Sequence, residues 1–444
     1  MEKTKPRKLD ISFESEMEVI ARDESDSSRK SKSKRSKNSG SKGKLWEFIA
    51  IASIPLVLVL GNSMLVPILP DMQRELGISQ FQSSLMITLF SVTAGVFIPV
   101  VGYLSDQFGR KAIIIPSLIV YGAAGILAGF GAIWGSYPIV IGARALQGLG
   151  AAGTAPIAMA LVGDLYSGGT ESKVLGLTEA SNGTGKVISP ILGAALALIV
   201  WYAAFFAFPI FCALSLVAVI FLIKEPSGKT TKKQPLGKYL RTIGSILKEK
   251  GRWLITSFFA GSLGLFSLFG ILFYLSEILE KPPYSIDGVM KGLVLAIPLA
   301  GLVITSYTTG SLIKKNGTLM RWLMNIGLAV ATVSLGLTLV FNKDRLYLFM
   351  GLITLSSIGT GLLLPCLNTM ITGSVDKSKR GMITSIYNSL RFLGVAAGPP
   401  LIGWLMEKND RYVFILLSAL SGVALTLVFF LVKPEGNIAR KSSS

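Results

Sequence analysis

Long apolar runs alternate with short polar segments along almost the whole chain. The hydrocarbon core of a bilayer is about 30 Å thick, and roughly 20 helical residues cross it. Twelve runs reach about this length, so we predict an all-α membrane protein with twelve transmembrane helices. The predicted spans are Trp46–Pro70, Phe81–Leu104, Ala112–Trp134, Tyr137–Val162, Val174–Val200, Tyr202–Ile223, Trp253–Leu279, Gly288–Ile313, Met320–Phe341, Leu346–Gly373, Met382–Met406 and Val413–Val432.

The longest polar segment inside the chain, residues 224–252, separates six spans from six more. It is rich in lysine, and its 238–250 portion could form a basic helix on anionic lipid or remain a solvated charged run. We therefore expect two six-helix bundles joined by a linker. The expected divisions are a disordered basic tail (1–45), the first bundle (46–223), the linker (224–252), the second bundle (253–432) and a short tail (433–444).

The charge pattern supports a membrane location. Only 16% of the residues are charged and 51% are hydrophobic, well away from ordinary soluble usage. The net charge of +19 would suit nucleic acid in a soluble protein, but most of the basic residues lie in the tails, the linker and the loops of one side. The positive-inside rule then places both termini in the cytoplasm, and the expected partners are anionic lipid headgroups rather than nucleic acid.

Small residues and prolines recur between the two halves at a spacing of about 210 residues. Small residues let helices approach closely and proline bends them, so the recurrence indicates two bundles of similar shape. Secondary transporters built from such repeats hold their substrate at mid-membrane between the halves. The matched pairs include Gly102 with Gly310, Gly148-x-Gly150 with Gly359-x-Gly361, and Pro190-x-x-Gly193 with Pro400-x-x-Gly403.

Several segments resemble a known family, the major facilitator superfamily, and within it the twelve-span drug:proton antiporters. Residues 102–111, GYLSDQFGRK, are similar to the signature loop between spans 2 and 3. Residues 144–152 of span 4 and 185–194 of span 5 resemble the exporters' motifs, except that Ser189 and Ala194 stand where glycine is usual. The resemblance covers about residues 46–432. It implies the major facilitator fold, a small-molecule substrate, and export in exchange for protons.

The signature loop predicts a latch between helices. Gly102 and Gly109 permit a tight turn, and Asp106 is placed to accept from backbone N–H groups at a helix N-terminus. Arg110 can reach an acid at the end of another span, for which Asp164 is well placed. By the resemblance, this latch holds one access state. The alternative is an ordinary charged turn.

Charges within the spans are the sharpest functional signals, because each is costly in lipid unless it faces a cavity or a partner. The resemblance makes Arg144 a proton-coupling residue. Lys186 and Arg391 fall near mid-membrane in the repeat-related spans 5 and 11, so we expect them to face each other across a central cavity. Glu179 lies well inside span 5, and we hypothesise that it carries the coupling proton. A structural glutamate is an equally good interpretation.

Further polar residues complete the predicted site. Asn62, Gln147 and Asn388 are expected to offer hydrogen bonds in the substrate cavity or, alternatively, between helices. Gly185, Pro190 and Gly193 form the predicted helix-bend motif of span 5. A cavity with two cations and few acids should favour anionic, phenolic or zwitterionic substrates.

The leading prediction is a proton-coupled exporter of drugs or metabolites in a bacterial inner or plasma membrane. The alternatives are export of a siderophore or another anionic metabolite, and proton-coupled import of a nutrient. The sequence has no histidine, two isolated cysteines and no GxxxxGK[ST] loop, so we expect no metal site, no cofactor and no enzymatic or ATP-driven activity. We expect a monomer, by family habit.

Overall fold

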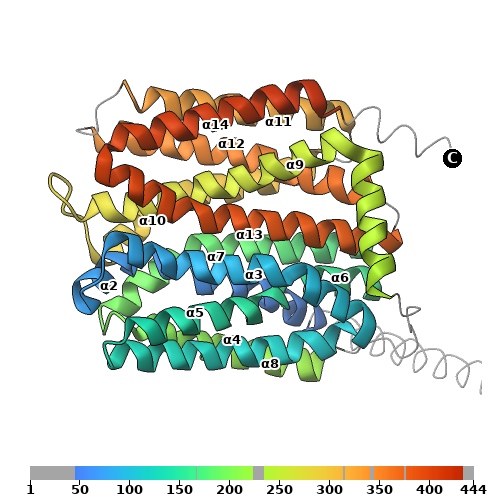
Figure 1. Ribbon diagram of the computed structural model, residues 1–444, viewed down its shortest axis with the longest axis horizontal. Coiled ribbons are helices and arrows are strands. Elements are labelled where there is room, and N and C mark those ends of the chain that lie inside the picture. The colour runs from blue at the N-terminus through green and yellow to red at the C-terminus, as the bar shows by residue number, and fades with distance from the viewer. Residues whose placement is uncertain are drawn as a thin grey trace, which may run out of the picture. The chain divides into compact units, whose positions relative to one another are not determined.

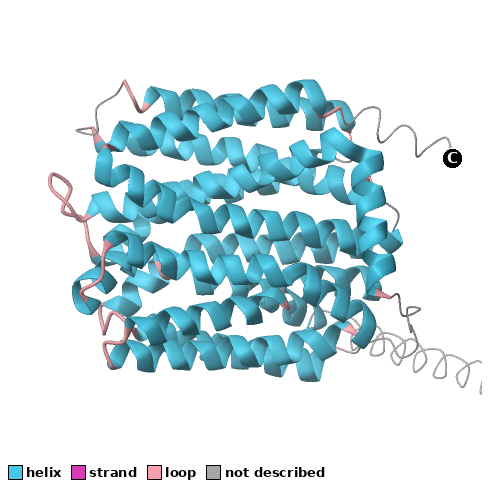
Figure 2. Ribbon diagram, in the orientation of Figure 1, coloured by secondary structure: helices cyan, strands magenta, loops and turns pink. Residues whose placement is uncertain are grey.

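A computed structural model describes residues 46–166, 168–223, 235–313, 316–340, 345–374 and 377–433. The predicted tail 1–45, residues 224–234 of the linker and most of the C-terminal tail lie outside these ranges. The chain divides into two units, Met1–Ile49 and Ala50–Ser444, and of the first the structure describes only Trp46–Ile49, which are helical. All described secondary structure is helical, as predicted (Figure 2).

The first half of the second unit begins with a helix over residues 50–63, followed by the short η1 (Val66–Ile68). The boundary between the next two helices is marked by a glycine and a capping box. Gly77, in the left-handed region, ends α2, and Ser79 forms the capping box at the N-terminus of α3. The remaining helices of this half are α2 (Leu69–Leu76), α3 (Gln80–Phe108), α4 (Arg110–Ile133), α5 (Tyr137–Ala152), α6 (Ala155–Leu165), α7 (Gly168–Ala197) and α8 (Ala203–Leu222).

The second half is built from six long helices. They are α9 (Leu236–Leu279), α10 (Gly288–Ile313), α11 (Gly317–Leu337), α12 (Leu346–Gly373), α13 (Lys377–Lys408) and α14 (Asp410–Leu431). The long helices of both halves lie roughly side by side across Figure 1. We call the end that carries α2 and the α9–α10 loop the α2 end, and the end that carries the first part of α9 the linker end.

The predicted spans match these helices, except that the helix of span 1 ends at Ser63 and is followed by η1 and α2. Two further differences lie elsewhere in the chain. Eleven helices of the described chain are long and apolar enough to cross a bilayer, and α7, with its ionisable residues, is a further helix of 30 residues. Span 4 is two helices, because the chain leaves helical geometry at Gly153 and Thr154 before Pro156 starts α6.

The second of these further differences lies in the linker. Its described part is helical from Leu236 and joins span 7 across a kink at Gly251, which has φ 41° and ψ −122°. Glycine is needed there because other residues rarely adopt positive φ. Tyr239 and Ile246 are buried along one face while Lys238 and Lys248 are exposed. Residues 238–250 are therefore helical, with an apolar side buried in the protein and lysines on the exposed side, and contact of this helix with anionic lipid stays a prediction.

The largest contacts between the halves in the described structure are those of α3 with α13 and of α7 with α10. Close approach at small residues makes both possible: Ser389 Oγ donates to the backbone oxygen of Gly95 at 2.5 Å, and a Cβ on Gly292 would lie 2.7 Å from the backbone oxygen of Pro190. Span 2 pairs with span 11 and span 8 with span 5, so exchanging the halves exchanges the two interfaces. This is the arrangement that the repeat predicts.

Large apolar side chains on the outer helices are exposed. Phe221 exposes 75% of its surface, and Leu214, Ile304 and Phe430 are also open. Exposed apolar area on this scale is rare on soluble proteins but suits contact with lipid tails.

Candidate functional site

Arg144 of α5 forms a hydrogen-bonded centre inside the first half, although it is wholly buried. Its Nε donates to the backbone oxygen of Met86 at 3.0 Å, and its Nη1 donates to that of Gly61 at 3.2 Å. Its Nη1 also donates to Gln147 Oε1, one turn away on the same helix, and its Nη2 to Asn62 Oδ1 at 3.3 Å. The guanidinium therefore ties α5 to span 1 and to α3.

The charge of Arg144 is held by neutral groups in the described structure. All four acceptors are carbonyl or amide oxygens, and the ring of Phe90 lies 4.5 Å from the guanidinium carbon in a cation–π contact. Asn62 and Gln147, predicted to line the substrate cavity, instead contact Arg144, and Gln147 Nε2 has no hydrogen-bond partner among the described residues. Among the described contacts of Arg144 there is therefore no carboxylate.

The signature loop brings its charged residues together at the linker end. Arg110 pairs with Asp106 at 2.5 Å and with Asp164 of α6 at 2.8 Å, and it donates to Ser105 Oγ at 2.6 Å. Gly109, at φ 100°, forms the turn between α3 and α4. The structure thus places Arg110 against the acid that spacing suggested, and it adds Asp106 as a second partner of the same guanidinium.

The predicted small residues lie where helices meet. Gly102 lies inside α3 and not in the turn that the sequence predicted for it. A Cβ on Gly102 would lie 2.8 Å from Ser385 Oγ of α13, so this glycine lets the halves approach. On α7, a Cβ at Gly185 would meet Leu56 at 2.8 Å, and one at Gly193 would lie 2.0 Å from the backbone oxygen of Met64. The motif around Pro190 therefore seats α7 against span 1.

Lys186 lies on the inner face of α7. The exposed residues Ile188 and Ala195 share one side of this helix, and at 100° per residue Lys186 lies on the opposite side. Its position falls between the side that meets span 1, marked by Gly185, and the side that meets Val303 of α10. This cation therefore points away from the lipid-facing surface and toward the region between the halves.

Arg391 lies on α13, the helix that the repeat relates to α7, five residues before the position that matches Lys186. Leu393 and Ala397 are exposed on the far side of the helix, while Arg391 and Asn388 share the inner side. Arg391 Nη1 donates to Asn388 Oδ1 at 3.3 Å, and the ring of Tyr387 lies 5.3 Å from the guanidinium carbon. Arg391 Nε is buried and has no hydrogen-bond partner in the described structure.

Glu179 belongs to α7 by its backbone, but its side chain lies outside the described structure. The hypothesis that it carries the proton therefore stays a prediction.

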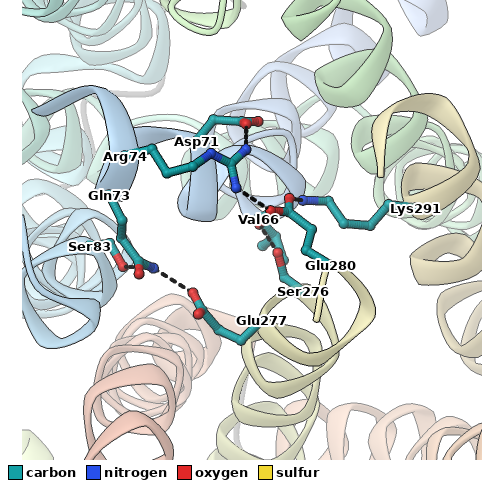
Figure 3. A network of polar contacts seen from close by, with 9 residues as sticks. All are labelled: Val66, Asp71, Gln73, Arg74, Ser83, Ser276, Glu277, Glu280 and Lys291. Carbon is teal, nitrogen blue, oxygen red and sulfur yellow. Dashed lines mark hydrogen bonds and ion pairs between the residues drawn. The ribbon is translucent and has the colours of Figure 1, made fainter. Parts of the chain in front are cut away.

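The structure reveals a polar cluster at the α2 end that the sequence analysis missed (Figure 3). Glu280 follows α9 and pairs with two cations, Arg74 of α2 at 2.5 Å and Lys291 of α10. Arg74 also pairs with Asp71. Lys291 is only 2% exposed, so its charge depends on Glu280. Burial alone raises the pKa of Glu280, but Lys291 and Arg74 outweigh it and hold the pKa below its ordinary value.

A second set of contacts in the cluster also joins the two halves. Gln73 Nε2 donates to Ser83 Oγ at 2.9 Å and to Glu277 Oε1 of α9 at 2.5 Å. Ser276 Oγ donates to the backbone oxygen of Val66 at 2.6 Å. Together with the Arg74–Glu280 pair, these bonds close the α2 end between the halves. The signal for them was present in the sequence, because Glu277 and Lys291 both fall inside predicted spans.

No group of three or more cysteine, aspartate or glutamate side chains in the described residues could hold a metal ion.

Comparison with protein-family models gives a match to the Major Facilitator Superfamily over residues 51–342 and again over 281–444. The chain belongs to the major facilitator superfamily. The resemblance drawn from the signature loop is thereby confirmed, and a superfamily member of this kind is a multi-pass membrane transporter, not an enzyme.

Two curated relatives are named as an exporter and an efflux protein. The chain is 43% identical over 398 residues to the bacillibactin exporter of Bacillus subtilis (strain 168), covering 89% of this chain and 98% of that protein. It is 27% identical to the multidrug efflux protein YfmO of the same organism, covering 81% and 86% of the two chains.

Among solved structures, the human organic anion transporter MFSD10 (TETRAN) matches with a TM-score of 0.66 and 18% identity, covering 86% of this chain and 99% of that one. At this identity the match supports the major facilitator fold alone.

Proposed function

We propose that this transporter exports a siderophore similar to bacillibactin in exchange for protons, by alternating access. The observation that carries the proposal is the pair of cations, Lys186 and Arg391, on the inner faces of the two repeat-related helices α7 and α13. Both helices also form the contacts between the halves. A substrate bound near these cations would therefore touch the surfaces that must part and close during transport.

The relative supplies the substrate class. An anionic substrate of this class would suit a region with two cations and few acids. Arg391 Nε has no hydrogen-bond partner in the described structure, and Asn388 beside it adds an amide. Of the alternatives that the sequence left open, a siderophore or other anionic metabolite is therefore the one we carry forward.

The test of substrate class is made in cells. A strain that makes such a siderophore but lacks this gene should retain it in the cytoplasm and release less to the medium. The wild-type gene should restore release. Normal secretion by the deletion strain in iron-poor medium, with the proposed exporter as the sole relative present, would contradict the substrate assignment.

The two cations should matter most for anions. Lys186→Ala and Arg391→Ala are each expected to reduce export of an anionic siderophore about tenfold, the value of one charge-assisted hydrogen bond of about 1.5 kcal/mol. Export of a cationic dye of similar size should fall much less. Equal losses for matched anionic and cationic compounds would show that these residues do not select charge. Lys408→Ala, at an exposed helix end, is the control.

Glu179 is the residue that we propose carries the coupling proton. Glu179→Gln removes the titrating group at nearly constant volume, so it should abolish export driven by a pH gradient while exchange of substrate down its own gradient continues. Membrane levels of the protein, measured by blotting, should not change. Unaltered gradient-driven export would remove Glu179 from the mechanism.

The orientation is part of the proposal. The positive-inside rule puts the linker end, with Arg110 and the basic helix before Gly251, in the cytoplasm and the α2 end outside. The exposed lysines of that helix are then placed to meet anionic headgroups. The described structure, closed at the α2 end, corresponds to a state that is shut to the outside.

A further inference from the structure

Two carboxyl groups one helical turn apart at the α2 end have opposite surroundings (Figure 3). Glu280 lies against two cations, Arg74 and Lys291. Glu277 is only 3% exposed, and the hydrogen bond it accepts comes from the neutral amide of Gln73. Among the described residues, no lysine or arginine nitrogen lies within ion-pair distance of Glu277. An ionised carboxylate buried in this way lacks the partner that such burial requires.

We infer that Glu277 takes up a proton from the outer solution and that this proton allows the α2 end to close. The inference rests on the proposed exchange of substrate for protons and adds the residue that senses the proton at the outer gate. When the halves part at this end, water reaches Glu277 and its carboxylate ionises. When they close, Glu277 leaves water, and the neutral carboxyl is the form that can be buried beside an amide.

The bond to Gln73 is compatible with this change of charge. Gln73 Nε2 has two hydrogens, and they are directed to Ser83 Oγ and to Glu277 Oε1. The carbonyl oxygen of a protonated carboxyl accepts this hydrogen bond as a carboxylate does. Gln73 lies in the first half and Glu277 in the second, so the bond forms only when the end is closed. The proton is added to a carboxylate oxygen from water, and the charge of the group changes from −1 to zero.

Other charged groups near Glu277 do not replace the proton. Lys291 and Arg74 are engaged by Glu280, which has the same charge as Glu277. Since Glu280 is held ionised by its cations, it does not titrate in the range where Glu277 is expected to. The described charged groups on or at the ends of the neighbouring elements are Asp71, Arg74 and Glu75 of α2, Glu280 and Lys281 after α9, Asp287 and Lys291 at the start of α10, Arg345 before α12, Glu407 and Lys408 of α13, and Asp410 and Arg411 of α14, while α3 presents Ser83.

The experiment measures closure directly in the full-length protein. Spin labels are placed on cysteines at two exposed positions of the α2 end, Glu75 in the first half and Tyr347 in the second, with the buried Cys212 and Cys366 replaced by alanine. The distance distribution in lipid nanodiscs is recorded from about pH 5 to about pH 9, a range that begins just above the ordinary pKa of a glutamate side chain. The closed-to-open ratio should rise as pH falls, by up to about tenfold per pH unit, the limit for one proton.

The variants separate the inference from a structural role. Glu277→Gln mimics the neutral carboxyl and should hold the short distance at every pH. Glu277→Asp keeps a titrating group and should keep a pH dependence with a shifted midpoint, so it serves if the glutamine variant fails to fold. A wild-type pH profile in both variants would overturn the inference.

The outcome is distinguishable from failure of the proposed function, because closure is measured without substrate or gradient. Export by the unaltered protein that ignores a pH gradient would contradict proton exchange itself. If export follows the pH gradient but the pH dependence of closure is unchanged in the Glu277 variants, only the role of this residue is contradicted.

Discussion

Replacing Arg144 with lysine is expected to lower gradient-driven export at least about a hundredfold while the protein still reaches the membrane. Arg144 donates four hydrogen bonds to span 1, α3 and its own helix, and its planar guanidinium also lies against Phe90. A lysine has three donors at a single nitrogen and cannot span these acceptors. Each hydrogen bond from a charged donor is worth about 1.5–3 kcal/mol, so losing two accounts for the expected factor.

The measurement is initial export rate in membrane vesicles, normalised to the amount of protein. Arg411→Lys, an exposed arginine at the start of α14, is the matched control and should keep wild-type rates. If the Arg144→Lys variant exported substrate at more than half the wild-type rate, the hydrogen bonds of Arg144 would have a structural role only and no part in the transport cycle.

Replacing Glu280 with glutamine is expected to destabilise the closed α2 end more than any other single change in the cluster. It leaves Lys291, 2% exposed, as a buried cation without its carboxylate. Breaking a buried ion pair in this way costs about 3–5 kcal/mol. The thermal unfolding midpoint in detergent should fall clearly, and cysteine probes at the α2 end should become reactive.

A double variant tests the cause. Glu280→Gln combined with Lys291→Met removes the buried charge together with its partner, so much of the lost stability should return. Glu407→Gln, an exposed carboxylate at the same end, should change nothing. A double variant as unstable as Glu280→Gln alone would show that the loss does not come from the unpaired lysine.

Hydropathy alone predicted the helices because lipid imposes a length and an apolar composition on every crossing helix. The Arg110–Asp164 contact was also predictable, since both residues lie at the same end of their spans. Gln147 is one turn from Arg144, so their contact follows from helical spacing as well, although the sequence assigned this amide to the substrate cavity.

The α2-end cluster could not be predicted in the same way. Its bonds join residues that are 204 and 206 positions apart, and which helix ends meet across the halves depends on tertiary packing. The repeat register also needed the structure. A Cβ on Gly148 would meet Phe90 of span 2, whereas one on its matched Gly359 would meet Gly327 of span 9. Span 9 is the repeat equivalent of span 3, not of span 2. The first and second glycines of each pair therefore contact their equivalent neighbouring spans in the opposite order.

The most direct test of the account is transport in inverted membrane vesicles that contain the wild-type protein. The interior of such a vesicle corresponds to the outside of the cell. Acidifying it should drive accumulation of an anionic siderophore from the medium, and a protonophore should abolish that accumulation. Accumulation that is indifferent to the pH gradient, or that appears only when the interior is alkaline, would contradict proton-driven export.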